Sequence, residues 1–278
     1  MQSWKWRREL CCVLLAGGVF QVSLVGTRDL QAVEPPATAA AAQAKSVEML
    51  QQQAREKISQ RKFKEAAELL TQVLAKDKEQ VSAYYVRGRA NFQLGEIKQS
   101  VKDFDAYVKR RPQVESRQWE RGIALYYAAE FKRGAQQFEL YQTFHDNDVE
   151  NSVWRFLCMA RSEGVEKARR VILPIKNDPR VPMMQVFEMY RGTVKPAEVL
   201  KAVHADKPTG DVLEGRLFYA HLYLGLYHEA IGNKEEAEKY IRLAAQESLK
   251  TNPRINTYMW DVARIHLEQF EKIKKLPK

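Results

Sequence analysis

Cysteine is scarce in this chain, and the common motifs of catalysis and nucleotide binding are missing. Only three cysteines occur in 278 residues, and two of them, Cys11 and Cys12, lie near the start. So few thiols cannot build the disulfide framework of many small exported domains. The sequence also has no glycine-rich phosphate loop and no Gly-x-Ser-x-Gly turn. We therefore predict a non-catalytic protein without a cofactor.

Histidine is also rare, and the five histidines form no metal-binding pattern. His221 and His228 are seven residues apart, about 10.5 Å along a helix, which is too far for one ion without a third ligand. The segment 145–148, His-Asp-Asn-Asp, lacks the closing glutamate of a calcium loop. We interpret His221 as a packing residue and the Asp and Asn side chains as caps of the next helix, and we predict no metal site.

The start of the chain has no hydrophobic segment long enough for a comfortable membrane span. Leu10 to Gly26 is 17 residues free of charge, and three basic residues precede it. This arrangement is typical of a secretory signal peptide. We predict that residues 1–33 are an export leader, with an uncleaved amino-terminal anchor as the alternative. If the leader is removed, Cys158 is the only thiol, and we expect a buried apolar role for it, with a cross-link between two chains as the alternative.

Residues 34–46 combine two prolines with a run of alanines. Proline holds the chain extended, and the small side chains offer little to a core. We therefore predict a tether before a folded body that begins at Val47. The alanines could also continue into the first helix, and the boundary stays open at this point.

The main positive feature is a repeat with a period of 34 residues. When the chain is shifted by one period, Gly122 falls on Gly88, and a second shift brings it to Ala54. Large apolar residues recur at other fixed offsets. Thirty-four residues is the length of the tetratricopeptide repeat, a pair of antiparallel helices. Small residues at a fixed position predict where the two helices come closest. The clear repeats are 47–80, 81–114, 115–148 and 218–251.

The segment 149–217 between the clear repeats is about two repeats long and rich in proline. We interpret it as two degenerate hairpins, 149–177 and 183–205, with short helices. Residues 255–273 predict one long helix that caps the last repeat. The expected fold is an all-α tetratricopeptide-repeat superhelix, an α-solenoid of about five helical hairpins plus a C-terminal capping helix.

Several segments resemble the NlpI-type tetratricopeptide-repeat lipoproteins of Gram-negative envelopes. They are Arg121–Tyr127, the helix end 138–144, Trp154, and the last clear repeat with 224–225 and 232–237. The resemblance covers roughly residues 81–250. It implies a homodimeric envelope adaptor that brings a C-terminal-processing type protease to cell-wall hydrolases without doing chemistry itself. One departure is that no cysteine follows the apolar run, where a lipoprotein would carry its lipid.

Aromatic and arginine side chains are expected on the concave side. In a tetratricopeptide stack the first helix of each repeat lines this side, and such residues dominate binding energy at interfaces. The structural alternative is that Phe92 and Ile123 pack partly on neighbouring helices. The lysine and asparagine of the carboxylate clamp of chaperone-binding repeats are not present at the matching positions. The predicted partner-binding groove consists of Tyr85, Arg89, Phe92, Trp119, Ile123 and Tyr126.

These features predict an exported scaffold of the periplasm or cell envelope that binds a protein or peptide in its groove. The net charge is +10, with only five bases and three acids before Val47, so the excess belongs mostly to the repeats. Spread over helix faces, this charge does not favour nucleic acid as a partner. The alternative function is an anchored basic protein that binds anionic cell-wall polymer or lipid head groups. Positive charge gathered on one face would favour the polymer-binding function, and an even spread would favour peptide binding.

Overall fold

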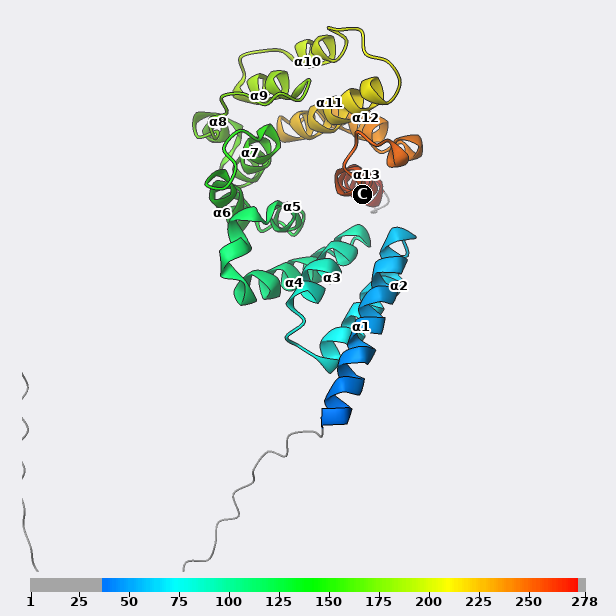
Figure 1. Ribbon diagram of the computed structural model, residues 1–278. Coiled ribbons are helices and arrows are strands. Elements are labelled where there is room, and N and C mark those ends of the chain that lie inside the picture. Colours follow the sequence, from blue (N-terminus) through cyan, green and yellow to red (C-terminus); the bar gives the residue numbers. More distant parts are fainter. Residues whose placement is uncertain (1–36, 275–278) are drawn as a thin grey trace, which may run out of the picture.

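The computed structural model describes residues 37–274, which form helices and loops without a strand. Successive helices pack as antiparallel hairpins that stack into a curved superhelix (Figure 1). The all-α solenoid is therefore confirmed. The first three hairpins are α1 (Ala37–Ser59) with α2 (Phe63–Lys76), α3 (Val81–Gln93) with α4 (Ile97–Arg110), and α5 (Trp119–Tyr127) with α6 (Phe131–Gln142), the 3-10 helix η1 (Pro112–Arg117) preceding α5.

The second half of the described chain adds three more hairpins, so the described residues contain six, one for each of the four clear repeats and the two degenerate segments. Each of the two irregular segments forms its own helix pair. Three of these four helices are short, as the proline content predicts, but Val149–Glu163 has 15 residues, so the expectation of short helices is wrong for this one. The pairs are α7 (Val149–Glu163) with α8 (Val165–Arg170), α9 (Met183–Arg191) with α10 (Pro196–Val203), and α11 (Gly210–Ala230) with α12 (Lys234–Ala244), followed by the 3-10 helix η2 (Glu247–Thr251) and α13 (Thr257–Lys274).

Glycine allows the two helices of a repeat to pack in close contact. A Cβ atom added to Gly122 would lie 2.5 Å from Cζ of Phe138 on the partner helix. At Gly225 the same atom would lie 2.6 Å from Cγ1 of Ile241. At Gly88 the nearest atoms, on Phe104, are 3.2 Å away. These glycines therefore lie where the paired helices touch, as the small residues of the repeat pattern predict.

Two smaller predictions about polar residues also agree with the structure. The carboxylate of Asp148 accepts a hydrogen bond from the Glu150 amide at 3.1 Å and so caps α7. The rings of His221 and His228 both stack on Tyr240, with centroid distances of 5.9 and 5.7 Å. Both histidines are thus packing residues. Cys158 is fully buried in α7, so a cross-link between chains through this thiol would require local unfolding.

The boundary left open in the alanine run is now defined, and one predicted boundary is wrong. Helix α1 begins at Ala37, which is the alternative in which the alanines continue into the first helix, because alanine has the highest helix propensity. Gln43 then donates from Nε2 to the carbonyl of Lys76 at 2.8 Å, which ties this extension to α2. Helix α11 begins at Gly210 rather than Phe218. The predicted leader, residues 1–33, lies outside the described residues.

The last helix, α13, does more than cap the final repeat. It packs on α12 and also contacts α3, and Figure 1 shows it inside the curve of the superhelix. A simple cap needs one apolar face and one polar face. The first half of α13 is instead buried all around, including Tyr258, Trp260 and Asp261. From α1 to the end of α13, the structure contains no helix long and apolar enough to cross a membrane.

Candidate partner-binding face

Helix α13 is fixed inside the groove by a buried carboxylate. Asp261 is fully buried and accepts a hydrogen bond from Arg61 Nη2 at 2.5 Å and from Gln93 Nε2 at 2.8 Å. Arg264 completes the link by donating from Nη2 to the carbonyl of Gln93 at 2.6 Å. The helix therefore joins the last repeat to the first two, and the chain fills part of its own concave face.

Three of the six predicted groove residues are core residues. Phe92 and Ile123 are 0% exposed and Tyr126 is 5% exposed. Phe92 stacks on Tyr258 of α13, and Tyr126 packs edge-on against Trp154 with centroids 5.4 Å apart. The prediction that these side chains face an open groove is wrong, because α13 covers Phe92, α7 covers Tyr126, and Ile123 is buried in the core.

The other three predicted residues stay accessible, in two hollows. Tyr85 and Arg89 line one of about 380 Å³ between α3 and the start of α13. The hydroxyl of Tyr85 donates to Glu120 at 2.7 Å, and burial raises the pKa of both groups. The guanidinium of Arg89 lies 5.8 Å from the Tyr85 ring centre and 5.3 Å from that of Tyr258. This hollow offers an aromatic and basic surface.

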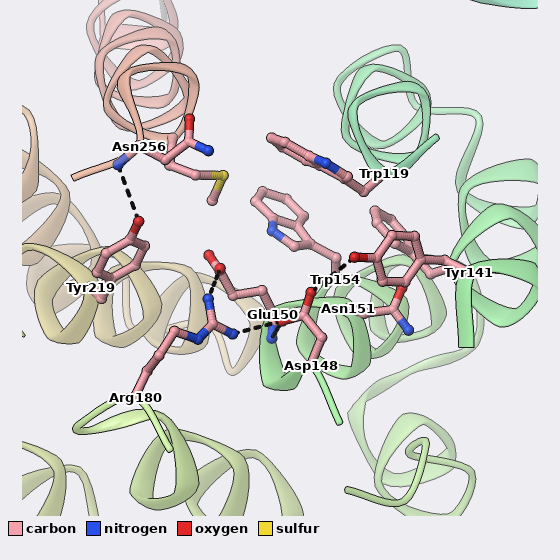
Figure 2. Close-up of a pocket in the computed structure, with 11 residues that line it drawn as sticks. Trp119, Tyr141, Asp148, Glu150, Asn151, Trp154, Arg180, Tyr219 and Asn256 are labelled. Atoms are coloured by element: carbon pink, nitrogen blue, oxygen red, sulfur yellow. Dashed lines mark hydrogen bonds and ion pairs between the residues drawn. The ribbon is translucent and has the colours of Figure 1, made fainter. Parts of the chain in front are cut away.

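Trp119 lines a second hollow, a cavity of about 200 Å³ among α5, α7, α11 and the start of α13 (Figure 2). Its ring packs edge-on against Tyr258 with centroids 5.3 Å apart. Tyr258 thus separates the two hollows. We call the cavity around Trp119 the central cavity. Its lining residues are Trp119, Phe138, Tyr141, Asp148, Glu150, Asn151, Trp154, Arg180, Tyr219, Asn256 and Met259.

A charged cluster forms one wall of the central cavity. Arg180 pairs with Asp148 at 2.8 Å, Glu150 at 2.6 Å and Asp178 at 2.6 Å. Glu150 also accepts a hydrogen bond from the hydroxyl of Tyr223 at 2.5 Å. Three carboxylates thus surround one guanidinium, and the cluster is negative overall when they are ionised.

The cluster shifts the pKa of its carboxyl groups in opposite directions. Burial raises the pKa of Glu150, and this effect exceeds the opposing attraction of Arg180. Burial also acts on Asp178, but its hydrogen bonds and charge attraction with Arg180 outweigh burial and lower its pKa. The wall therefore keeps Asp178 ionised while Glu150 takes up a proton more readily.

The sequence pattern does not indicate the charged side of this cavity. The capping role predicted for Asp148 is correct, but no pattern marks Glu150 or Arg180. These residues converge because the loop after α8 folds back over the start of α7. No spacing pattern marks such a contact, since it joins residues about 30 positions apart through an irregular loop.

A match to a family model agrees with the repeat architecture over part of the chain. Residues 52–115, from within α1 to η1, match the family model described as tetratricopeptide repeat. A crystal structure of a tetratricopeptide repeat protein from Parabacteroides merdae aligns with 80% of this chain and 83% of its own, at 14% identity and a TM-score of 0.47. Repeats of this type generally present extended concave surfaces to other proteins. The helix pairs of the structure and the match to the family model define a helical-repeat protein, a class whose repeats generally serve protein interaction.

Proposed function

We propose that this protein is an exported, non-catalytic scaffold that binds polypeptide partners on the part of its concave face left open by α13. The observation that carries the proposal is the pair of hollows on either side of Tyr258. One presents Tyr85 and Arg89 and the other presents Trp119. Accessible aromatic and arginine side chains in partly enclosed sites are the usual anchors of protein interfaces.

The sequence pattern of residues 1–33 supports export, and we place the protein in the periplasm or cell envelope. A retained leader would also anchor it to a membrane. The resemblance to NlpI-type adaptors supports a finer form of the proposal. In that form a homodimer of this protein brings a processing protease to cell-wall hydrolases.

The alternative function, binding of anionic cell-wall polymer or lipid head groups, fits the central cavity poorly. Its charged wall contains Asp148, Glu150 and the single cation Arg180, which also pairs with Asp178 outside the lining. A polyanion that entered here would meet like charge at short range, which is unfavourable in a partly buried site. The cavity therefore favours a polypeptide over a polyanion.

Affinity capture from the native cells tests this function. The full-length protein carries a C-terminal tag, and bound proteins are identified by mass spectrometry for the unaltered protein, Trp119→Ala and Phe144→Ala. Phe144 is a matched control because its ring is about half exposed and lines neither hollow. We expect a protease and hydrolases with the unaltered protein and the control, and a strong loss with Trp119→Ala. Recovery of polysaccharide alone would overturn the proposal.

A further inference from the structure

We propose that the central cavity receives a lysine or arginine side chain of the polypeptide partner. This inference rests on the proposed function and names the chemistry that the partner must present. It follows from the charge of the cavity wall, the aromatic side chains around it, its size and two polar atoms that have no partner.

The charge of the wall favours a cation. Asp148 and Glu150 supply two carboxylates to the lining, and Arg180 supplies the only positive charge among the residues that line the central cavity. Asp178 does not line the cavity but pairs with the same arginine, so the cluster as a whole is negative when its carboxylates are ionised. A guest with one positive charge would bring the cluster closer to neutrality. The attraction is strong at this place because the carboxylates are partly removed from water.

Arginines beyond Tyr219 do not cancel this charge. Arg216 and Arg254 line a neighbouring hollow of about 320 Å³, whose other lining residues include Tyr219 and Arg180. Arg216 is already paired with Asp206. The central cavity is therefore the acidic one of the two hollows that meet at Tyr219. A cationic side chain should bind there rather than in the neighbouring hollow.

Aromatic rings surround the space beside the carboxylates. Figure 2 shows Trp119, Trp154 and Tyr141 on one side of the cavity and Tyr219 on the other, with Glu150 between them. The faces of such rings attract ammonium and guanidinium groups, and tryptophan does so most strongly. The rings also pack against the methylene groups of a long basic side chain.

Two buried polar atoms of the lining have no hydrogen-bond partner. They are Nε1 of Trp154, whose side chain is 1% exposed, and Oδ1 of Asn151, at 2%. Figure 2 shows the indole nitrogen of Trp154 on the side of its ring that faces the cavity. Buried polar groups without partners are rare and costly. A basic side chain can donate to Asn151, and a carbonyl oxygen of the same peptide can accept from Trp154.

The size of the cavity fits one side chain rather than a whole ligand. Its volume is about 200 Å³, whereas sites for small molecules usually measure about 300–1,000 Å³. The central cavity would therefore act as a pocket for a single residue, and the hollow with Tyr85 and Arg89 would contact other parts of the same polypeptide.

Peptide selection on the full-length protein tests the inference without any substitution in it. Short random peptides are displayed on phage and selected on the immobilised protein. The selected peptide is then synthesised with Lys, Arg, Gln or Glu at each basic position, and affinities are measured by calorimetry. At one position we expect Lys and Arg to bind about tenfold tighter than Gln, and Glu to bind weakest. This preference should shrink at high salt.

The outcomes separate this inference from the proposed function. If no peptide is selected, the proposed function fails. If peptides bind but none requires Lys or Arg, the inference fails while the proposed function stands. If neutral cell-wall glycan displaces the peptide and binds equally well, the cavity recognises sugar and the inference is wrong.

Two further measurements locate the site. The indole N–H signal of Trp154, assigned by comparison with Trp154→Phe, should shift on addition of the Lys peptide and not the Gln peptide. Glu150→Gln should reduce the preference for Lys over Gln several-fold, whereas Glu166→Gln, at an exposed position of α8, should not. If the Glu150→Gln protein does not fold, Asp148→Asn replaces it as the test of the Lys preference, and the indole signal of Trp154 still locates the site. An unmoved Trp154 signal during tight Lys-peptide binding would overturn the assignment of the cavity.

Discussion

Tyr258 of α13 stacks on Phe92 of α3, with ring centroids 4.9 Å apart and ring planes 18° from parallel. The last helix thus places an aromatic ring on the concave face, where the repeat pattern predicts a bound partner. One consequence is that the concave face is divided into two hollows instead of one continuous groove. Another is that the first repeats depend on the C-terminal helix for part of their packing.

The close contact between Gly122 and Phe138 predicts a graded set of stability losses. Any Cβ at position 122 must displace a buried ring, because the nearest atom lies 2.5 Å away. We expect Gly122→Leu to lower the free energy of unfolding by about 1–3 kcal/mol. Gly88→Ala should cost less than Gly122→Ala, since the contact there is 3.2 Å. Urea unfolding measures all three. Equal stability of Gly122→Leu and the unaltered protein would show that the assigned register is wrong.

Trp119 and Trp154 line the same cavity and should respond differently to truncation. Trp119 is half-buried, so Trp119→Ala should weaken partner binding by about 2–4 kcal/mol, roughly 30-fold to 1000-fold, with a small change in melting temperature. Trp154 is a core residue, so Trp154→Ala should lower stability by about 3–5 kcal/mol. Calorimetric binding and thermal melting separate these effects. A large loss of stability for Trp119→Ala with unchanged affinity would assign Trp119 to the core.

Asp261 should be essential for holding α13 in the groove. Asp261→Ala leaves Arg61 and Gln93 without their buried partner, and breaking such a pair typically costs about 3–5 kcal/mol. Asp261→Asn is the milder comparison, because the amide keeps the shape and one acceptor oxygen. Chemical unfolding gives the stability, and binding of a hydrophobic dye reports exposure of Phe92. If Asp261→Ala neither unfolds earlier nor binds dye, α13 is not held by this contact.

His221 predicts a loss of stability in mild acid. Burial lowers its pKa from 6.5 to about 4. Between these two pH values the unfolded chain binds a proton that the folded chain does not, so the free energy of unfolding falls as the pH falls. From pH 7 to pH 5 the contribution of this residue is on the order of 1–2 kcal/mol.

His221→Phe provides the comparison, since it keeps a ring to stack on Tyr240 and removes the titrating group. Urea unfolding measures the free energy of unfolding of the unaltered protein and of His221→Phe at pH 7 and pH 5. Between these pH values the variant should lose about 1–2 kcal/mol less than the unaltered protein. A difference that does not depend on pH would contradict the prediction.

The sequence by itself determined the repeat fold and the places of closest packing. Helix pairing within a repeat is local, and only a small residue fits where two helices touch, so Gly88, Gly122 and Gly225 report the register directly. The same locality explains why the cap at Asp148 was predicted correctly, since it involves only the first turn of its own helix.

The candidate site was predictable only in part. The repeat pattern states which face of a first helix is concave, and it therefore identified Tyr85, Arg89 and Trp119. It cannot state which part of that face another segment covers. Phe92, Ile123 and Tyr126 satisfy the same pattern and are buried.

Only the tertiary structure decided how α13 and the irregular loops close over the concave face. The contacts of Asp261 with Arg61 and of Arg180 with Glu150 join segments that no periodicity relates. Each depends on the path of the whole superhelix, whose curvature accumulates from small rotations between repeats. The repeat motif depends on the spacing of residues that are close in sequence. The shape and charge of the central cavity instead arise from side chains that meet only after the solenoid has curved upon itself.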